Sequence, residues 1–325
     1  MSRNVSLKAI ASRLGVSVNT VSHALRDMND ISEATKSRVR KTAVEMGYMP
    51  NHVAQMMKTE ERKVVGVHVS SFTNLYFNSL STELSRVFAE KGRYVLLFLF
   101  SPQLGIEVIK QCVLQRVDLL IASELPDEKC AEFAKLNNIR IVLTGSLYAS
   151  TDEYDHIRVD DEGGCRLVAR YLYSFHKGKR YIYAGPDYEC NLKRQELFCA
   201  ELRKLDPDVE IIVYNSDETN IRVLSSLIAG GCRSIFCFND TLVYELLDML
   251  NAQCVDAHRL YPDLHIIGFD GLCEFVRGMR QITTVKIDYA EFALGIYEVV
   301  HKRLSQPDIA IQHLTIPVSL HCKRG

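Results

Sequence analysis

The 325-residue sequence predicts a small all-α head followed by an α/β body of two lobes with parallel sheets. One observation is a change of period: apolar residues recur at helical spacing up to Met46, whereas short continuous apolar runs begin at Val64. The other is charge. Residues 1–63 hold 11 Lys and Arg against 6 Asp and Glu, a net charge of +5, and the remaining 28 basic and 34 acidic residues give −6. A basic head on an acidic body suggests that only the head meets a polyanion, and chance variation in surface charge is the alternative.

Composition excludes several classes of protein. Hydrophobic residues make up 47% of the chain and charged residues 24%, as in ordinary globular proteins. The longest apolar run, Val95–Phe100, is too short to span a bilayer, and no signal peptide is visible, so we expect a cytoplasmic protein. The ten cysteines include no C-x-x-C pair, so no zinc site is expected.

Three short helices are expected in the head, over residues 6–14, 18–25 and 32–46, with serines as their N-caps. Gly15 supplies the first turn, because glycine accepts positive φ at no steric cost. Two short helices joined by a three-residue turn form a helix-turn-helix, whose second helix fits the major groove of DNA. An ordinary three-helix bundle with a polar surface is the alternative.

The second helix separates an inward stripe from an outward one. Val21 and Leu25 face the first helix, whereas Asn19 and His23 point outward. Asn bonds adenine N6 and N7 together, and His can donate to guanine N7 or O6. Short hydroxyls suited to phosphate contacts flank these side chains: Ser17, Thr20 and Ser22.

A short amphipathic segment follows the third helix. Pro50 ends that helix, Asn51 can cap the next one, and the charged run 58–63 resembles a linker. Alone, such a helix is too short to be stable in water, so it should fold only against its twin in a dimer or in a DNA minor groove. A plain interdomain linker is the alternative.

The body alternates short apolar runs with helical patterns, which predicts βαβ units and parallel sheets. Nine strands are expected, over residues 64–69, 94–100, 118–123, 139–145, 156–160, 180–185, 209–214, 234–238 and 265–269. A helix is expected from about Asn78 to Lys91. The number of strands exceeds one comfortable sheet, so we expect two lobes with a first crossover near residue 157.

Candidate ligand residues stand just after strands, because open α/β sheets bind ligands at the carboxyl ends of their strands. They are Asn74, Tyr76 and Phe77, then Asp187 and Arg194, then Asn239 and Asp240, and finally Asp270. Aromatic rings with convergent carboxylates, an amide and a guanidinium suit a polyhydroxylated or heterocyclic small molecule. Singly, the Asn-Asp pair also fits a helix cap, and the Tyr-Phe pair also fits the core.

The sequence favours no enzyme. It has no G-x-G-x-x-G, no G-K-[ST] loop and no H-E-x-x-H, so no cofactor is expected. Asp160 and Asp161 are adjacent and face opposite ways on a strand, and we expect Asp161 to cap the helix that begins near Glu162. A free sugar-binding protein would explain the body but not the basic head.

The segments "SLKAIASRLGVSVNTVSHALR" and "ISEATKSRVRKTAVEMGYMPNHVAQMMK" resemble the N-terminal domain of the lac repressor (LacI) family of bacterial transcription regulators. The match rests on V-S-x-x-T-V-S, G-Y-x-P-N and A-x-x-x-K at the family's spacing. The resemblance implies that Val18, Asn19 and His23 read bases. It also implies a hinge helix in which Met57 wedges open the minor groove.

The body segments "GPDYECNLKRQELF", "FCFND", "IIGFDG" and "ITTVKID" look like the family's periplasmic-binding-protein-like effector domain. There Arg194, Asn239 and Asp270 would bind the effector, and Tyr76 and Phe77 would line the first lobe.

The resemblance implies a homodimeric regulator, expected to be a repressor, on a near-palindromic operator. We expect a sugar or sugar derivative as effector; a nucleobase or a protein partner is the alternative. The expected domains are a head (1–49), a hinge helix and linker (50–63) and a body (64–325), with lobe 1 over 64–157 and 288–313 and lobe 2 over 158–287 and 314–325.

Overall fold

The structure of the chain is a computed structural model. It describes residues 5–48, 63–71, 73–99, 104–145, 152–177, 180–187, 189–215, 221–252, 261–275 and 278–322. The chain divides into two compact units, Met1–Arg62 and Lys63–Gly325, called here the head unit and the body.

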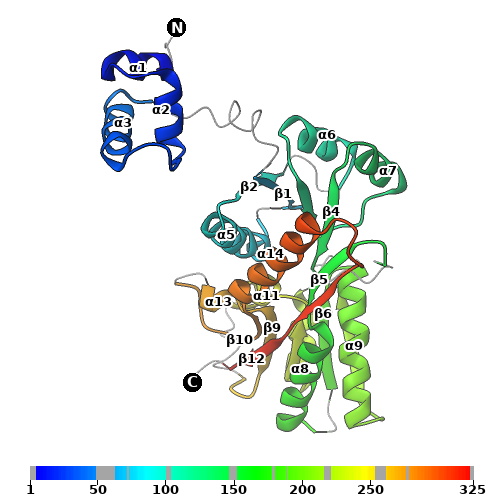
Figure 1. Ribbon diagram of the computed structural model, residues 1–325. Helices are drawn as coiled ribbons and strands as arrows, with labels where there is room; N and C mark the ends of the chain where they lie inside the picture. The colour runs from blue at the N-terminus through cyan, green and yellow to red at the C-terminus, as the bar shows by residue number, and fades with distance from the viewer. Residues whose placement is uncertain are drawn as a thin grey trace. The chain divides into compact units, whose positions relative to one another are not determined.

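The head unit contains the three expected helices, α1 (Leu7–Leu14), α2 (Val18–Leu25) and α3 (Glu33–Glu45) (Figure 1). Each begins after a predicted serine cap, because the Oγ of Ser6, Ser17 and Ser32 accepts a hydrogen bond from the backbone N–H three residues later. Gly15 has φ +66° and ends α1 in the left-handed conformation, as its place in the turn requires.

A small apolar core joins the three head helices. Its buried members are Ile10, Ala11, Val21, Ala24, Val39 and Ala43. The prediction of Val21 as an inward residue is confirmed, whereas Leu25 is only half-buried and Ala24 takes the deeper position. The small side chain of Ala24 lets α2 approach its neighbours closely, which spacing alone does not reveal.

The body contains two six-stranded sheets of parallel strands, apart from one antiparallel edge pair. The first has the order β11-β5-β4-β3-β1-β2. Its strands are β1 (Val64–His68), β2 (Tyr94–Phe98), β3 (Leu119–Ala122), β4 (Arg140–Thr144), β5 (Asp155–Val159) and β11 (His313–Ile316).

The second sheet has the order β12-β10-β9-β8-β6-β7, with β12 antiparallel to β10. Its strands are β6 (Arg180–Gly185), β7 (Glu210–Asn215), β8 (Ser234–Cys237), β9 (His265–Asp270), β10 (Thr283–Ile287) and β12 (Val318–His321). The fold is therefore the predicted one: a helix-turn-helix head and a two-lobed α/β body.

Helices cover both faces of each sheet, because each face carries buried apolar side chains. On the first sheet, α5 (Leu75–Glu90) and α14 (Tyr289–Ser305) cover one face, and α6 (Ile106–Leu114) and α7 (Glu128–Leu136) the other. On the second sheet, the side-by-side helices α8 (Asp161–Phe175) and α9 (Glu189–Leu205) cover one face (Figure 1). The other face is covered by α10 (Ile221–Ala229) and α11 (Asp240–Ala252), and the short α13 (Leu272–Phe275) follows β9.

The chain passes between the sheets three times. It leaves the first sheet after Val159 rather than near residue 157, returns after Ile287, and stays in the first sheet up to Ile316 rather than residue 313. The later crossings have a physical reason: β11 pairs with β5 over its whole length, and Ile316 lies opposite Val159 in that ladder.

Candidate functional site

The outward face of α2 carries six of the residues predicted to contact DNA. The side chains of Ser17, Val18 and Asn19 are exposed, and those of Thr20, Ser22 and His23 are half-exposed. Val18, an apolar residue at the start of the helix, is 44% exposed and does not belong to the head core. Asn51 and Met57, the other two predicted DNA contacts, lie outside the described residues.

The hydroxyls of α2 are used within the helix itself. The Ser17 Oγ accepts from the Thr20 N–H at 2.9 Å and is 2.8 Å from the Thr20 Oγ1. The pair therefore stabilises the first turn of α2. The backbone carbonyl of Ser22 accepts from the Arg26 Nε at 3.2 Å, which holds that guanidinium against the last turn.

Asp27 and Asp30 of the α2–α3 loop, two acids to which sequence reasoning gave no role, contact basic side chains. The His23 Nδ1 is 2.6 Å from the Asp30 Oδ2. The Asp27 Oδ1 accepts from Arg40 at 2.6 Å and lies 3.1 Å from the Lys36 Nζ, and these two cations hold the pKa of Asp27 below its ordinary value. Part of the basic charge of the head unit is thus paired inside it.

In the first lobe, the predicted aromatic residues lie on a helix rather than in a loop. The Asn74 Oδ1 accepts from the Tyr76 N–H at 3.0 Å, so α5 begins at Leu75 and not near Asn78. Tyr76 and Phe77 are half-buried in its first turn, with ring centroids 5.2 Å apart. The expected start was wrong because an Asn cap outweighs the weak apolar periodicity of this turn.

In the second lobe, Arg194 of α9 is buried, and its guanidinium is held on its edges and on its faces. Its Nε donates to the Asp161 Oδ1 at 2.9 Å, and its Nη1 donates to the Phe238 carbonyl at 2.5 Å. Its Cζ lies 3.7 Å from the ring centroid of Phe269 and 4.7 Å from that of Phe238. Burial lowers the pKa of Arg194, but the carboxylates of Asp161 and Asp270 more than offset this and raise it, so the charge is retained.

Asp161 does not cap α8 as expected. The cap is Asp160, whose Oδ1 accepts from the Gly163 N–H at 2.9 Å. Asp161 is the first helical residue, is buried, and faces Arg194, 33 residues later in the chain. Spacing along one strand cannot reveal such a partner.

Asp270, at the end of β9, is buried with a φ of +120°, which is unusual for a residue other than glycine. It neighbours Asp240, whose carboxylate accepts from the Leu272 N–H at 2.7 Å and bonds the Thr284 hydroxyl at 2.5 Å. Burial raises the pKa of Asp240 to about 7, and burial with the charge of Asp240 raises that of Asp270 well above its ordinary value. The site therefore holds two neighbouring buried carboxyl groups, both with pKa values above the ordinary range.

Asn239 fits the helix-cap interpretation, and its role as a ligand residue stays a prediction. Its Oδ1 accepts from the Leu242 N–H at 2.9 Å, so it caps α11, while its half-buried amide stands beside Asp240. Asp187 is exposed after β6.

Tyr289, the first residue of α14, was missed by sequence reasoning. Its buried ring lies 6.0 Å from that of Tyr76, centroid to centroid. Burial and the charge of Asp270 raise the pKa of its hydroxyl well above the ordinary value, so it stays protonated. Tyr289 therefore lies near Tyr76 of the first lobe and within the electrostatic influence of Asp270 of the second.

Three buried hydroxyls stand at the carboxyl ends of strands or just beyond: Ser123, Thr144 and Thr241. Among the described residues, none of these hydroxyl oxygens has a hydrogen-bond partner. A buried polar group without a partner costs free energy, so these atoms suit the polar groups of a bound ligand.

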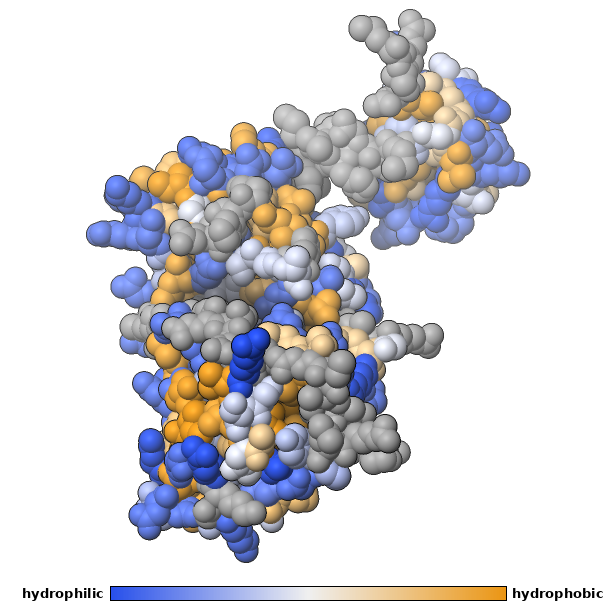
Figure 2. All heavy atoms as spheres, turned by 180° about the vertical axis from the view of Figure 1, so that it is seen from behind, coloured by the Kyte–Doolittle hydropathy of each residue, from blue (hydrophilic) through white to orange (hydrophobic). Residues whose placement is uncertain are grey.

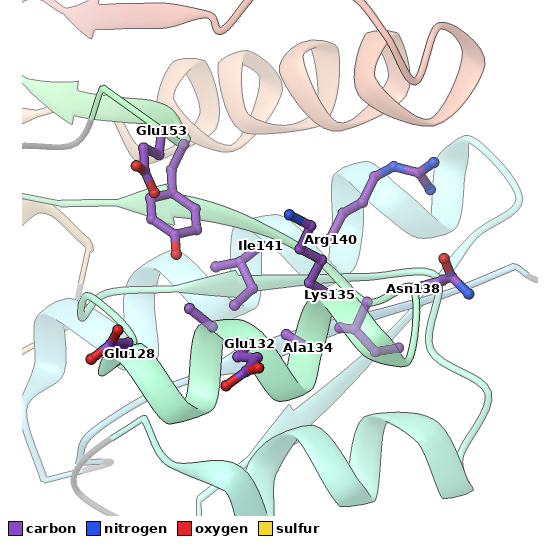
Figure 3. A pocket seen from close by; sticks show the side chains of 11 residues that line it. Glu128, Glu132, Ala134, Lys135, Asn138, Arg140, Ile141 and Glu153 are labelled. Atoms are coloured by element: carbon purple, nitrogen blue, oxygen red, sulfur yellow. The ribbon is translucent and has the colours of Figure 1, made fainter.

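A separate groove of about 640 Å³ opens on the first lobe, between α7, β4 and the approach to β5 (Figure 3). Its lining includes Glu128, Glu132 and Lys135 of α7 and Arg140 of β4, charged side chains of both signs. It contains none of the eight candidate ligand residues that follow strands in the sequence. In the described part of the chain, no His, Cys, Asp and Glu cluster could hold a metal ion, and no helix is long and apolar enough to cross a membrane.

Comparison with known proteins assigns the head unit. The family described as bacterial regulatory proteins, lacI family, matches residues 6–51. The matched residues are those of the head unit. The chain is 24% identical over 316 residues to the HTH-type transcriptional repressor PurR of Vibrio atlanticus, covering 93% of each chain. The match in the head unit and the similarity to a repressor over nearly the whole chain together support a lacI-family DNA-binding transcriptional regulator.

Solved structures support the fold of the lacI-family body. A lac repressor dimer bound to operator and the anti-inducer ONPF matches with a TM-score of 0.78 and 21% identity, over 99% of this chain and 98% of that one. A periplasmic binding protein/LacI transcriptional regulator from Alkaliphilus metalliredigens, complexed with D-xylulofuranose, matches with a TM-score of 0.65 and 20% identity, over 80% and 97%. The body thus has the periplasmic-binding-protein-like fold.

Proposed function

We propose that the protein is a cytoplasmic repressor whose affinity for its operator is controlled by a small polar molecule bound between the two lobes. The observation that carries the proposal is the group around Arg194: a buried guanidinium paired with Asp161, a buried Asp270, and the Tyr76 and Tyr289 rings that approach from the first sheet's helices. These groups stand at the carboxyl ends of parallel strands, where such folds bind ligands.

A sugar or sugar derivative fits this chemistry best. The guanidinium and the Asn239 amide donate hydrogen bonds, the carboxyl oxygens of Asp270 accept them, and hydroxyls such as Thr144 lack partners among the described residues. Such a mixture of donors and acceptors matches the hydroxyls of a polyol, and aromatic rings suit its apolar face. The xylulofuranose complex of the similar Alkaliphilus protein favours the same class.

A homodimer would place two heads on the half-sites of a near-palindromic operator. Apolar side chains reach the surface of the body at several places (Figure 2). In the first lobe the exposed ones include Tyr94 and Leu99 beside the open edge of β2, and Val113 and Leu114 on α6. Burial of such a surface against a second copy would stabilise a dimer. In this scheme Asn51 and Met57 belong to the hinge helix, with Met57 as the minor-groove wedge.

The first prediction tests the recognition helix. Asn19→Ala should leave the chain folded, because Asn19 is exposed, but relax base choice by about 1–3 kcal/mol at one base pair of each half-site. The measurement is binding to single-base variants of an operator selected from randomised duplexes by the wild-type protein. Asn29→Ala, at an exposed position in the loop after α2, serves as the control. An Asn19→Ala protein with unchanged discrimination at every position would remove Asn19 from the interface.

A further inference from the structure

The loop between α2 and α3 places Asp30 against the recognition helix, and hydrogen bonds hold this loop in shape. Its Oδ2 lies 2.6 Å from the Nδ1 of His23, seven residues earlier. The loop turns back at Asp27, which has φ +62°, and the Met28 N–H donates to the His23 carbonyl at 3.1 Å. From α3, Arg40 donates to Asp27 at 2.6 Å and holds the turn. The contact between the acid and the ring is therefore supported by the backbone and by a neighbouring helix.

The contact with Asp30 determines which nitrogen of the His23 ring can face a base, and whether that nitrogen donates or accepts a hydrogen bond. An ionised carboxylate only accepts hydrogen bonds, so the Nδ1 of His23 must carry the proton that it shares with Asp30. In a neutral imidazole the other nitrogen, Nε2, is then an acceptor. In the major groove an acceptor matches the amino groups of adenine N6 and cytosine N4. Donation to guanine, the contact expected from sequence, is open only to the charged ring.

A role in surface charge does not account for Asp30. Its side chain is 56% exposed beside the helix that faces DNA, where a carboxylate repels phosphates of any sequence. The loop's other acid, Asp27, is neutralised by Lys36 and Arg40, whereas the ion-pair partner of Asp30 among the described residues is His23. A carboxylate at this position weakens binding to DNA of any sequence. Its presence is explained if it increases the protein's discrimination between base sequences.

We propose that Asp30 is a positioning residue that holds the His23 ring in one orientation and one tautomer and thereby narrows the set of bases that His23 reads. The inference rests on the proposed function, because it requires α2 to lie in the major groove. Asp30 touches no base in this scheme and acts through His23.

The test uses the full-length protein and an operator selected by the wild type from randomised duplexes. Affinities are measured for all four base pairs at each position with wild type, Asp30→Ala, Asp30→Asn, His23→Ala and the double variant His23→Ala/Asp30→Ala. Asp30→Ala should lose about three- to tenfold discrimination at one base pair per half-site, the same one affected by His23→Ala. Affinity for unrelated DNA should stay equal or rise, since a negative charge is removed.

Three comparisons separate positioning from stability or charge. In the double variant, Asp30→Ala should add no further loss to His23→Ala. Asp30→Asn keeps an acceptor oxygen and should retain more discrimination than Asp30→Ala. Glu45→Gln, an exposed acid at the end of α3, removes the same charge without touching His23 and should leave discrimination unchanged. A uniform loss at every position, or an equal loss in the His23→Ala background, would overturn the proposal.

A second measurement needs no DNA. In full-length protein carrying ¹⁵N-histidine, the His23 ring signals, assigned by their loss in His23→Ala, should show a proton on Nδ1, and Asp30→Ala should shift the ring toward the Nε2–H tautomer. A wild-type ring protonated on Nε2 alone would refute the positioning role even if the protein binds DNA. If the wild type selects no sequence but shows the Nδ1–H tautomer, the DNA-binding assignment fails and the contact itself stands.

Discussion

At the scale of single residues, the neighbouring acids Asp240 and Asp270 make the stability of the candidate site depend on pH. A Cβ on Gly268 would lie 2.1 Å from the Asp240 Oδ1, so this glycine leaves the space that Asp240 fills. There Asp240 is enclosed, and the bonds to Thr284 and the Leu272 N–H fix its carboxyl group. The protein therefore keeps a titratable group in a place where its charge is costly.

Because the pKa of Asp240 rises from 3.8 to about 7 on folding, the folded state binds more protons than the unfolded state between these values. The free energy of unfolding should therefore fall as the pH rises from about 4 to about 7 and level off above. Asp240→Asn keeps an acceptor for the Leu272 N–H and carries no charge; its amide N–H replaces the oxygen that accepts from the Thr284 hydroxyl, and that hydroxyl can still donate to the Val285 carbonyl. Relative to wild type it should gain roughly 2 kcal/mol of stability between pH 5 and pH 8, measured by urea unfolding.

The control for this prediction is Asp248→Asn, which removes an exposed acid from the same helix. Its stability relative to wild type should hardly change with pH. If Asp240→Asn and Asp248→Asn follow the same pH profile, Asp240 is already ionised in the folded protein, and the electrostatic description of this site is wrong.

The candidate effector residues that directly follow a strand could be predicted, because a strand and the residue after it are recognised from a short stretch of sequence. Arg194 and Asp270 lie together in the second lobe, as their sequence context suggested. Asp161 and Tyr289 were missed, because each is defined by partners far along the chain: Asp161 by a guanidinium on α9, and Tyr289 by a ring on α5. Only tertiary packing brings these groups together.

At the scale of elements, α2 depends on its first turn. It has eight residues, too few for a stable isolated helix, and Ser17 caps it through the Thr20 N–H at 2.9 Å. Ser17→Ala should cost about 1 kcal/mol of head stability. Ser6→Ala removes the matching cap of α1, where the Ser6 Oγ accepts from the Ala9 N–H at 3.3 Å.

The two variants form a matched pair for DNA binding. If Ser17 acts only as a cap, Ser17→Ala should weaken binding to all sequences no more than Ser6→Ala does, after correction for the folded fraction of the head unit in thermal melts. A larger loss for Ser17→Ala, with unchanged base preference, would assign the Ser17 hydroxyl a phosphate contact as well.

Elements with strong local signals were predictable, and elements defined by pairing were not. The nine predicted strands are present within a few residues, because each carries an apolar run and the central ones, such as β3 and β8, are buried along their whole length. β10, β11 and β12 were not expected: β12 is an edge strand with half-exposed residues, and β11 forms only because it lies beside β5. Their sequences carry little apolar signal of their own.

At the scale of the whole molecule, the candidate effector site adjoins the segments that connect the lobes. Asp161 lies two residues after Val159, where the chain first leaves the first sheet, and Tyr289 lies two residues after Ile287, where it returns. The first and third crossings are bonded to each other, since the Asp160 N–H donates to the Ile316 carbonyl at 2.9 Å. A ligand bound by Arg194 and Tyr289 would therefore act directly on the segments about which the lobes can move.

This arrangement predicts that ligand response and DNA binding can be separated by mutation. A ligand is first sought by thermal melting against sugars, sugar phosphates and nucleobases, because one present at about 100 times its Kd stabilises its domain by about 2.7 kcal/mol. Asp270→Asn should bind the operator like wild type, since Asp270 lies in a different unit from the helix-turn-helix, but should lose both the melting shift and the effect of ligand on operator affinity. Asp248→Asn should keep both. An Asp270→Asn protein that responds normally would exclude Asp270 from the site, and a variant that keeps the melting shift but loses the operator response would place Asp270 in lobe movement rather than in ligand contact.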